Sequence, residues 1–257
     1  MKKKVFQFFL FLLSPILAFS AVDLSESECQ FYSRNGEDGV LVKIFKLIKP
    51  SSRFCIDLGA TDGFTGSNTV LLRWQGWGCL LLDKKYDIPQ NHLHEEFITK
   101  ENVNDLLSKY SAPVDADLLC IDMDYNDFYI WKAMDEKYKP VVVVIRYNGT
   151  HLAHEDKVVQ YRPYFCGDGS NYFGASILAL YHLGRAKGYS LVYAEKNGMN
   201  LFFIREDVLL KNHLVFKDMN DVEKLYRKPN YGTGPNGGYR QDPKNRPYLS
   251  SMDLLNR

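Results

Sequence analysis

Acidic residues and glycines stand where two hydrophobic runs of the chain end. The stretch "FCIDLGATDGF" is an apolar run that reaches Asp57 and continues through Gly59 and Gly63. A later stretch, "LLCIDMD", ends in Asp122 and Asp124. Carboxylates at the ends of buried strands can bind the hydroxyl groups of a ligand or take up a proton. The chain therefore carries candidates for both ligand binding and proton transfer.

The first group has the spacing D-x-G-x-x-x-G. Gly59 lets the chain turn sharply after the strand, and we expect Gly63 to let the backbone approach a ligand closely. The spacing differs from the G-x-G-x-x-G of pyrophosphate-binding loops, and no third glycine follows to pack the helix against the strand. The pattern favours a cofactor without a pyrophosphate. A tight turn with no ligand is the alternative reading.

A second apolar run, "GWGCLLLD", ends in Asp83. Its unbroken hydrophobic character is typical of a parallel strand that is covered on both faces. An acid about 20 residues beyond such a glycine loop can accept hydrogen bonds from both hydroxyls of a ribose. Asp83 is therefore a candidate for ribose binding, and capping of a following helix is the alternative.

Asp122 and Asp124 are the candidate catalytic residues. One role is that of a general base for a substrate hydroxyl. Another is to bind a divalent cation together with Asn148, since hard cations prefer oxygen ligands. A third reading is structural, with Asn126 or Asp127 capping a helix and the rest in solvent. We favour the first role and expect no metal.

The histidine-rich stretches indicate little chemistry. "HLHEE" at residues 92–96 and "HLAHE" at 151–155 lack the H-E-x-x-H order of zinc proteases and have no C-x-x-C partner. We expect polar surface positions, with a base role for His151 or His154 as a weaker alternative. The sequon Asn148-Gly-Thr150 matters only in a eukaryotic secretory route.

Hydrophobic patterning predicts an alternation of strands and helices. Such alternation predicts a mostly parallel sheet with helices on both faces, and Asn197-Gly198 predicts a closing antiparallel hairpin. Beyond residue 230, a segment rich in Gly, Pro and Asn predicts a loose loop or tail. The strands are expected at residues 53–58, 76–83, 96–98, 117–121, 140–148, 189–194 and 200–205, and the helices at 38–48, 67–74 (capped by Ser67), 101–110 (capped by Thr99), 127–138 and 173–188.

Two stretches, "YSRNGEDGVLVKIF" and "FCIDLGATDGFTGSNTVLLRWQGWGCLLLD", resemble the FkbM-type family of S-adenosylmethionine-dependent methyltransferases. That family opens with Tyr-Ser-x-x-Gly-Glu-Asp, has an acid–glycine loop followed by Ser-Asn-Thr, and has an acid after a Gly-Trp strand. The resemblance covers roughly residues 31 to 205. The matching positions are Tyr32, Ser33, Gly36, Glu37, Asp38, Asp57, Gly59, Ser67, Asn68, Thr69, Gly76, Trp77 and Asp83.

The resemblance implies a Rossmann-like class I methyltransferase fold, a mostly parallel seven-stranded sheet with a terminal antiparallel hairpin. It implies S-adenosylmethionine as the cofactor and a sugar or glycan hydroxyl as the methyl acceptor. The chain departs from the family after the fourth strand, where Asp122-Met-Asp124-Tyr-Asn126-Asp127 replaces Asp-x-Glu-Gly. The candidate cofactor-binding residues are Asp57, Gly59, Gly63, Asn68 and Asp83.

The first 20 residues have the pattern of a signal peptide. Three lysines precede an apolar run, and Ala18 and Ser20 form a small-residue cleavage site. Loss of this leader removes three positive charges from a chain with a net charge of +1, so a basic nucleic-acid surface is not indicated. We expect export to a periplasmic or extracellular location, a membrane anchor if the leader is retained, and no stable membrane span after cleavage.

The rest of the chain suits one α/β domain at residues 21–210 with a partly irregular C-terminal extension at 211–257. Five cysteines, three of them in apolar runs, do not form a disulfide framework, although Cys29 with Cys166 is a weak candidate pair.

Two other functions stay open. One is an exported, non-catalytic binding protein on a methyltransferase fold. The other is a glycosyltransferase that binds a metal through Asp122-x-Asp124.

Overall fold

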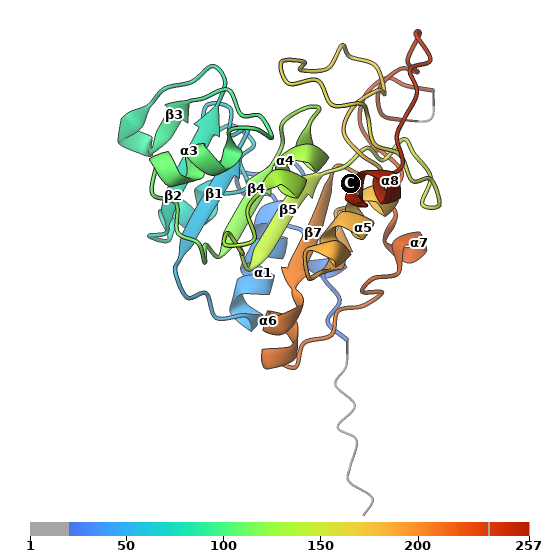
Figure 1. Ribbon diagram of the computed structural model, residues 1–257. Helices are drawn as coiled ribbons and strands as arrows, with labels where there is room; N and C mark the ends of the chain where they lie inside the picture. Colours follow the sequence, from blue (N-terminus) through green and yellow to red (C-terminus); the bar gives the residue numbers. More distant parts are fainter. Residues whose placement is uncertain (1–20, 236, 257) are drawn as a thin grey trace, which may run out of the picture.

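A seven-stranded sheet forms the centre of the computed structural model, which describes residues 21–235 and 237–256 (Figure 1). The predicted leader lies outside these residues. The strands are β1 (Phe54–Leu58), β2 (Gly78–Asp83), β3 (Leu93–Glu95), β4 (Leu118–Ile121), β5 (Val142–Arg146), β6 (Tyr189–Ala194) and β7 (Asn200–Arg205). The helices are α1 (Glu37–Leu47), α2 (Val70–Trp74), α3 (Val103–Lys109), α4 (Asp127–Ala133), α5 (Ile177–Ala186), α6 (Glu206–Lys211), α7 (Val222–Leu225) and α8 (Ser251–Leu255).

The sheet is mostly parallel with an antiparallel end, as the alternation predicts. Its strand order is β3-β2-β1-β4-β5-β7-β6. Neighbouring pairs from β3 to β5 are parallel, whereas β7 runs antiparallel to both β5 and β6. The β6–β7 hairpin turns at Gly198, whose φ of +74° suits the Asn-Gly sequence. The architecture is a Rossmann-like α/β fold.

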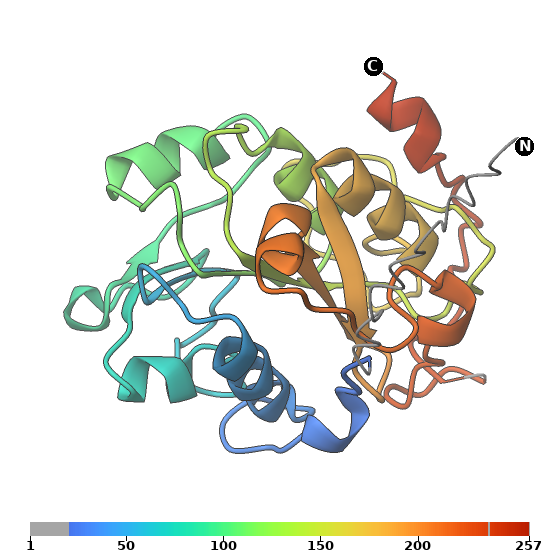
Figure 2. The same cartoon turned by 90° about the horizontal axis from the view of Figure 1, so that it is seen from below.

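Helices cover both faces of the sheet, which explains the unbroken hydrophobic runs (Figure 2). Alternate residues of each strand point to opposite faces. In β1, Ile56 packs in the core beneath α3, α4 and α5, and Cys55 packs in the core beneath α1, α2 and α6. Because both faces are buried, the parallel strands need apolar residues at every position.

Three local predictions are wrong at the glycine loop and beyond β2. The third strand is Leu93–Glu95 rather than residues 96–98, because buried Leu93 pairs with Leu81 of β2. Ser67 does not cap α2, since its hydroxyl contacts Asp57 and the N–H of Thr69 instead. The cap position of α3 is taken by Asn102, not Thr99.

The C-terminal segment is irregular as expected, but it is packed rather than loose. Leu249 pairs with Val158, and α8 packs against α5 (Figure 1). Phe216 pairs with Val22 near the start of the described chain. Residues near both ends of the described chain therefore belong to the folded body.

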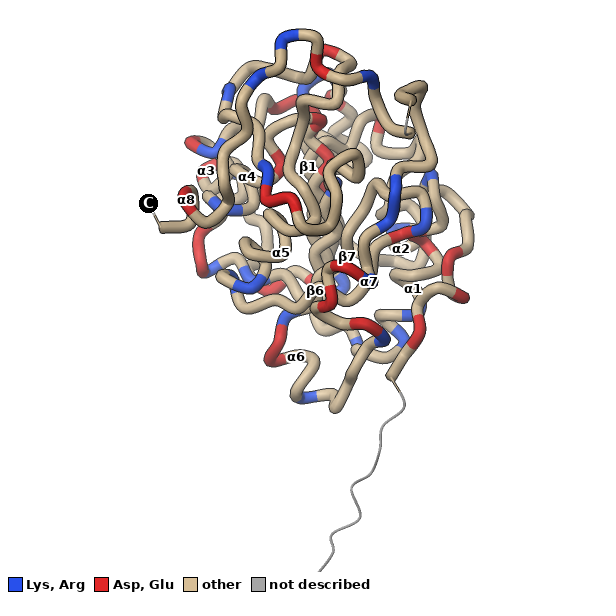
Figure 3. Tube along the Cα trace, turned by 90° about the vertical axis from the view of Figure 1, so that its right-hand side faces the viewer, with Lys and Arg blue, Asp and Glu red and all other residues tan. Residues whose placement is uncertain are grey.

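Acidic and basic residues are interspersed over the chain trace in the view of Figure 3. This agrees with the balanced numbers of acidic and basic residues in the sequence. Within residues 21–235 and 237–256, no helix has the length and apolar character required to cross a membrane.

Candidate functional site

Two adjoining cavities open at the carboxyl ends of β1, β2 and β4. The main cavity has a volume of about 250 Å³ and the narrow cavity about 60 Å³. Arg34, Gly59, Thr61 and Asp122 line both of them, so the two cavities adjoin, and together they are called the cleft. Ligands bind at this edge in open α/β sheets. The cleft is therefore the candidate site.

Gly59 is required by the neighbouring strand. Its φ is +88°, and a Cβ atom there would lie 2.1 Å from the carbonyl oxygen of Asp122. Gly63 also has a positive φ, of +72°, but it faces Leu81 and lies outside both cavities. Gly63 thus shapes the turn of the loop, and its predicted approach to a ligand stays a prediction.

Asp83 lies in the main cavity with its carboxylate fixed by the backbone. Its Oδ2 accepts the N–H of Thr61 at 3.0 Å, and its Oδ1 accepts the N–H of Lys85 at 2.9 Å. The side chain ties the glycine loop to the end of β2 and caps no helix, since the next element, a short 3-10 helix, begins only at Pro89. Each carboxylate oxygen retains a further acceptor position, so Asp83 can still bind ligand hydroxyls.

The narrow cavity is lined by buried acids and amides. Asp57 is 6% exposed, and its Oδ2 accepts weak hydrogen bonds from Ser67 at 3.4 Å and Thr69 at 3.3 Å. Burial raises the pKa of Asp57 to about 6. Glu37 and Asn68 line the same space. This end of the cleft favours a ligand group with a positive charge.

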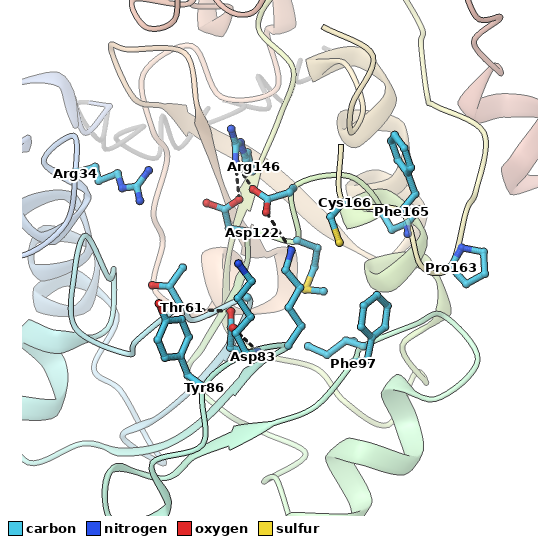
Figure 4. A pocket seen from close by; sticks show the side chains of 17 residues that line it. Arg34, Thr61, Asp83, Tyr86, Phe97, Asp122, Arg146, Pro163, Phe165 and Cys166 are labelled. Atoms are coloured by element: carbon cyan, nitrogen blue, oxygen red, sulfur yellow. Dashed lines mark hydrogen bonds and ion pairs between the residues drawn. The ribbon is translucent and has the colours of Figure 1, made fainter. Parts of the chain in front are cut away.

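The Tyr-Ser-x-x-Gly-Glu-Asp stretch holds Arg34 at the junction of the cavities. The Oδ2 atom of Asp38 accepts the N–H groups of Phe31, Tyr32 and Ser33 at 2.6–3.0 Å. Glu37 accepts the N–H of the residue after Arg34 at 2.8 Å. These bonds fix the loop on both sides of Arg34, whose side chain enters the site opposite Phe165 and Pro163 (Figure 4).

Arg146, at the end of β5, joins the two candidate catalytic acids. Its Nη1 lies 3.0 Å from Asp122 Oδ1 and 3.1 Å from Asp124 Oδ1. The Nζ of Lys84 lies 3.6 Å from Asp124 Oδ2. Burial alone would lower the pKa of Arg146, but the charge of Asp122, its hydrogen bond to Arg146 and the charge of Asp124 raise it above its ordinary value. The guanidinium is therefore a permanent positive charge beside both acids.

Asn148 does not join the two acids. Its amide is fully buried and donates to the carbonyl groups of Asn171 at 2.8 Å and Phe173 at 2.9 Å. Arg146 occupies the position between the carboxylates that a shared cation would need. In the part of the chain that the structure describes, no cluster of three His, Cys, Asp or Glu residues is arranged to hold a metal ion. Buried Asn148 is also closed to glycosylation in the folded protein.

Asp127, which follows the two candidate acids, has a structural role. Asp127 accepts the N–H of Met123 at 2.9 Å and so fixes the loop that carries both acids. Burial and, secondly, the charge of Asp122 raise the pKa of Asp127 to about 7. His151 is buried against Tyr248 rather than at the surface, and burial lowers its pKa to about 4. It lines neither cavity.

Sequence reasoning missed the residues that close the cleft. Phe97 and Ile98 follow β3, and Pro163, Phe165 and Cys166 come from the long loop between β5 and α5. Their separations in sequence leave no local pattern. Arg146 had a visible signal, because a charged residue at the end of the most apolar strand is unusual. Cys29 and Cys166 are both free, so the weak disulfide prediction is not supported.

Comparison with known proteins gives no family profile that matches the chain and no curated protein with a significant sequence match. The FkbM-type resemblance therefore stays a prediction from the motifs, and the function has to be argued from the cleft.

Proposed function

We propose that this protein binds S-adenosylmethionine in the cleft and transfers its methyl group to a hydroxyl group. The observation that carries the proposal is the pairing of two adjoining cavities with different chemistry. The main cavity contains Asp83 and apolar side chains, and the narrow cavity contains buried acids with Arg34 at the junction. This matches a ligand with a nucleoside end and a charged amino-acid end.

The main cavity suits adenosine. Asp83 presents fixed acceptors for the ribose hydroxyls, and Ile98 and Met123 supply apolar surface for a flat base. Gly59 keeps the floor between the cavities free of a side chain. The absence of a pyrophosphate-binding glycine pattern supports a ligand of this kind over a dinucleotide.

The narrow cavity suits the amino-acid end of the cofactor. Asp57 and Glu37 favour its ammonium group, and Arg34 can pair with its carboxylate. The Nδ2 of Asn200 donates to Glu37 Oε1 at 2.7 Å, which holds that acid in place. The ligand can therefore bind in only one direction along the cleft, with its amino-acid end in the narrow cavity.

S-adenosylmethionine, when bound, supplies a methyl group that its sulfonium already activates. The protein has to align an acceptor hydroxyl and remove its proton. Asp122 lines both cavities and is 46% exposed at its side chain, with Oδ1 held by Arg146. We assign Asp122 as the base and Asp124 as its neighbour on the acceptor side. The resemblance supplies the acceptor class, a sugar or glycan hydroxyl.

The metal-dependent glycosyltransferase is less well supported. Arg146 lies between Asp122 and Asp124, and Asn148 is bonded elsewhere. An exported, non-catalytic binding protein would have the same cleft, and only a test for methyl transfer distinguishes it from an enzyme.

We also propose that the leader is cleaved. Mass spectrometry of the mature N-terminus tests this, and an intact Met1 in the membrane fraction would be the contrary result.

Calorimetry with S-adenosylhomocysteine tests the central proposal. We expect saturable binding at one site in the folded wild-type protein, with alkylation of Cys166 slowed by the ligand. Cys29 is exposed outside both cavities and serves as the internal control. Folded protein that shows no binding at millimolar ligand would refute the proposal.

A further inference from the structure

The main cavity is bounded on one side by residues 163–166 of the loop between β5 and α5, here called the wall. Pro163, Phe165 and Cys166 line the cavity from this loop. The base of the wall is tied to the domain, because Asn126 Nδ2 donates to the carbonyl of Arg162 at 2.8 Å. The Phe165 ring also packs edge-on against Tyr125, with ring centres 4.7 Å apart, and a second polar attachment lies on the other side of the wall.

The C-terminal segment provides that attachment through Arg246. Its Nη2 lies 2.7 Å from Asp168 Oδ2, just beyond the wall, and its Nε lies 2.9 Å from Asp242 Oδ2. The Arg246 side chain is 9% exposed, and its guanidinium carbon lies 4.2 Å from the centre of the Tyr172 ring. A planar guanidinium that is held by two acids and a ring has little freedom to move.

The attached part of the loop has little packing of its own. Gly167 and Gly169 flank Asp168, with φ values of +74° and +78°. A Cβ at Gly169 would meet nothing within 4 Å. Since glycine restricts the backbone least of all residues, the order of this segment rests on polar contacts, among them the Asp168–Arg246 ion pair and the bonds of Ser170 to Asp168 and Arg246.

The same C-terminal segment also reaches the catalytic acids. The hydroxyl of Tyr239 accepts a hydrogen bond from Arg146 Nη2 at 3.3 Å, and Arg240 accepts the N–H of Asn171 at 2.7 Å through its carbonyl oxygen. Residues 239–246 thus contact both the loop that carries the wall and the arginine beside Asp122. The C-terminal segment therefore connects the two sides of the site.

We propose that Arg246 is a positioning residue that acts through Asp168 to hold the wall against the nucleoside end of the bound ligand. The proposal rests on the proposed function for the identity of that ligand. It assigns a role in the site to a C-terminal segment that matches no known motif. The wall borders the main cavity only, so its effect falls on adenosine and not on the amino-acid end.

The test compares wild-type protein with Asp168→Asn, which keeps the shape of the side chain and removes the charge. We expect Asp168→Asn to weaken the binding of 5′-methylthioadenosine and of S-adenosylhomocysteine equally, by about fivefold, the usual effect of one hydrogen bond. Hydrogen exchange should rise in residues 163–171 and stay unchanged in β4 and β5. Asp168→Glu, which keeps the charge, should restore affinity.

The matched control is Asp207→Asn, which breaks an Arg–Asp pair with Arg205 away from both cavities. It should leave ligand affinity unchanged. If wild-type protein binds both nucleosides and Asp168→Asn binds them as tightly, the positioning role is refuted and the proposed function stands. If wild-type protein binds neither nucleoside, the proposed function fails, and the positioning role fails with it. Unchanged hydrogen exchange in Asp168→Asn would refute the inference that the Asp168–Arg246 ion pair orders the loop.

Discussion

Replacement of Arg34 by glutamine should weaken the binding of the amino-acid end of the proposed ligand and leave the binding of its nucleoside end unchanged. Arg34 lines both cavities and is held in place by the bonds of Glu37 and Asp38 to the loop around it. S-adenosylhomocysteine carries a carboxylate that Arg34 can bind, whereas 5′-methylthioadenosine has the same adenosine and thioether without the amino-acid end. We expect Arg34→Gln to weaken only the first ligand.

The size of the effect follows from the exposure of Arg34. A hydrogen bond to a charged group contributes about 1.5–3 kcal/mol, and solvent screening of an exposed side chain such as Arg34 reduces this. An effect of about 1.4 kcal/mol corresponds to about a tenfold loss of affinity. Glutamine retains part of the aliphatic stem that packs on Gly66, so the loop should stay in place.

Isothermal titration calorimetry with both ligands measures the difference directly. Lys85→Gln is the control, because Lys85 is an exposed cation in the main cavity and has no access to the narrow one. It should affect both ligands to the same small extent. Equal losses for both ligands in Arg34→Gln, or no loss for either, would show that the carboxylate does not bind at Arg34.

Three further predictions follow from the acids of the cleft. Asp83→Asn, which keeps one acceptor oxygen but loses the charge, should weaken both ligands by about tenfold in calorimetry, because both contain the ribose; an unchanged affinity would remove Asp83 from the ribose site. Asp122→Asn should abolish methyl transfer to saccharide acceptors, measured as the release of S-adenosylhomocysteine, and should leave cofactor affinity within a few-fold. A chelator should have little effect on the activity of the wild-type protein. Complete loss of activity on chelation would support a metal bound by Asp122 and Asp124. Burial raises the pKa of Asp57 to about 6, so its stabilising protonated form is lost as the pH rises through that value. Denaturant unfolding should therefore show the wild type losing about 1–3 kcal/mol relative to Asp57→Asn between pH 4 and pH 7, and a pH-independent difference would contradict this.

The sequence by itself determined the elements whose character is local. The hydrophobic runs of β1, β2 and β5 predict buried parallel strands because both of their faces are covered. Asn197-Gly198 predicts the hairpin because that dipeptide adopts the turn with little strain. Asp57, Asp83 and Asp122 are predicted to lie close together because parallel strands end at one edge of a sheet, which brings together the residues at their carboxyl ends.

Only the tertiary structure decided how the cleft is completed. Arg146 bonds to Asp122, which lies 24 residues away in the sequence, and to Tyr239, which lies 93 residues away. Gly59 is needed because the backbone of Asp122 passes beside it, which the loop sequence does not reveal. The C-terminal segment reads as a loose tail because Gly, Pro and Asn carry no hydrophobic period. Its order comes instead from side chains such as Arg246, whose partners are brought near only when the sheet and its helices are in place.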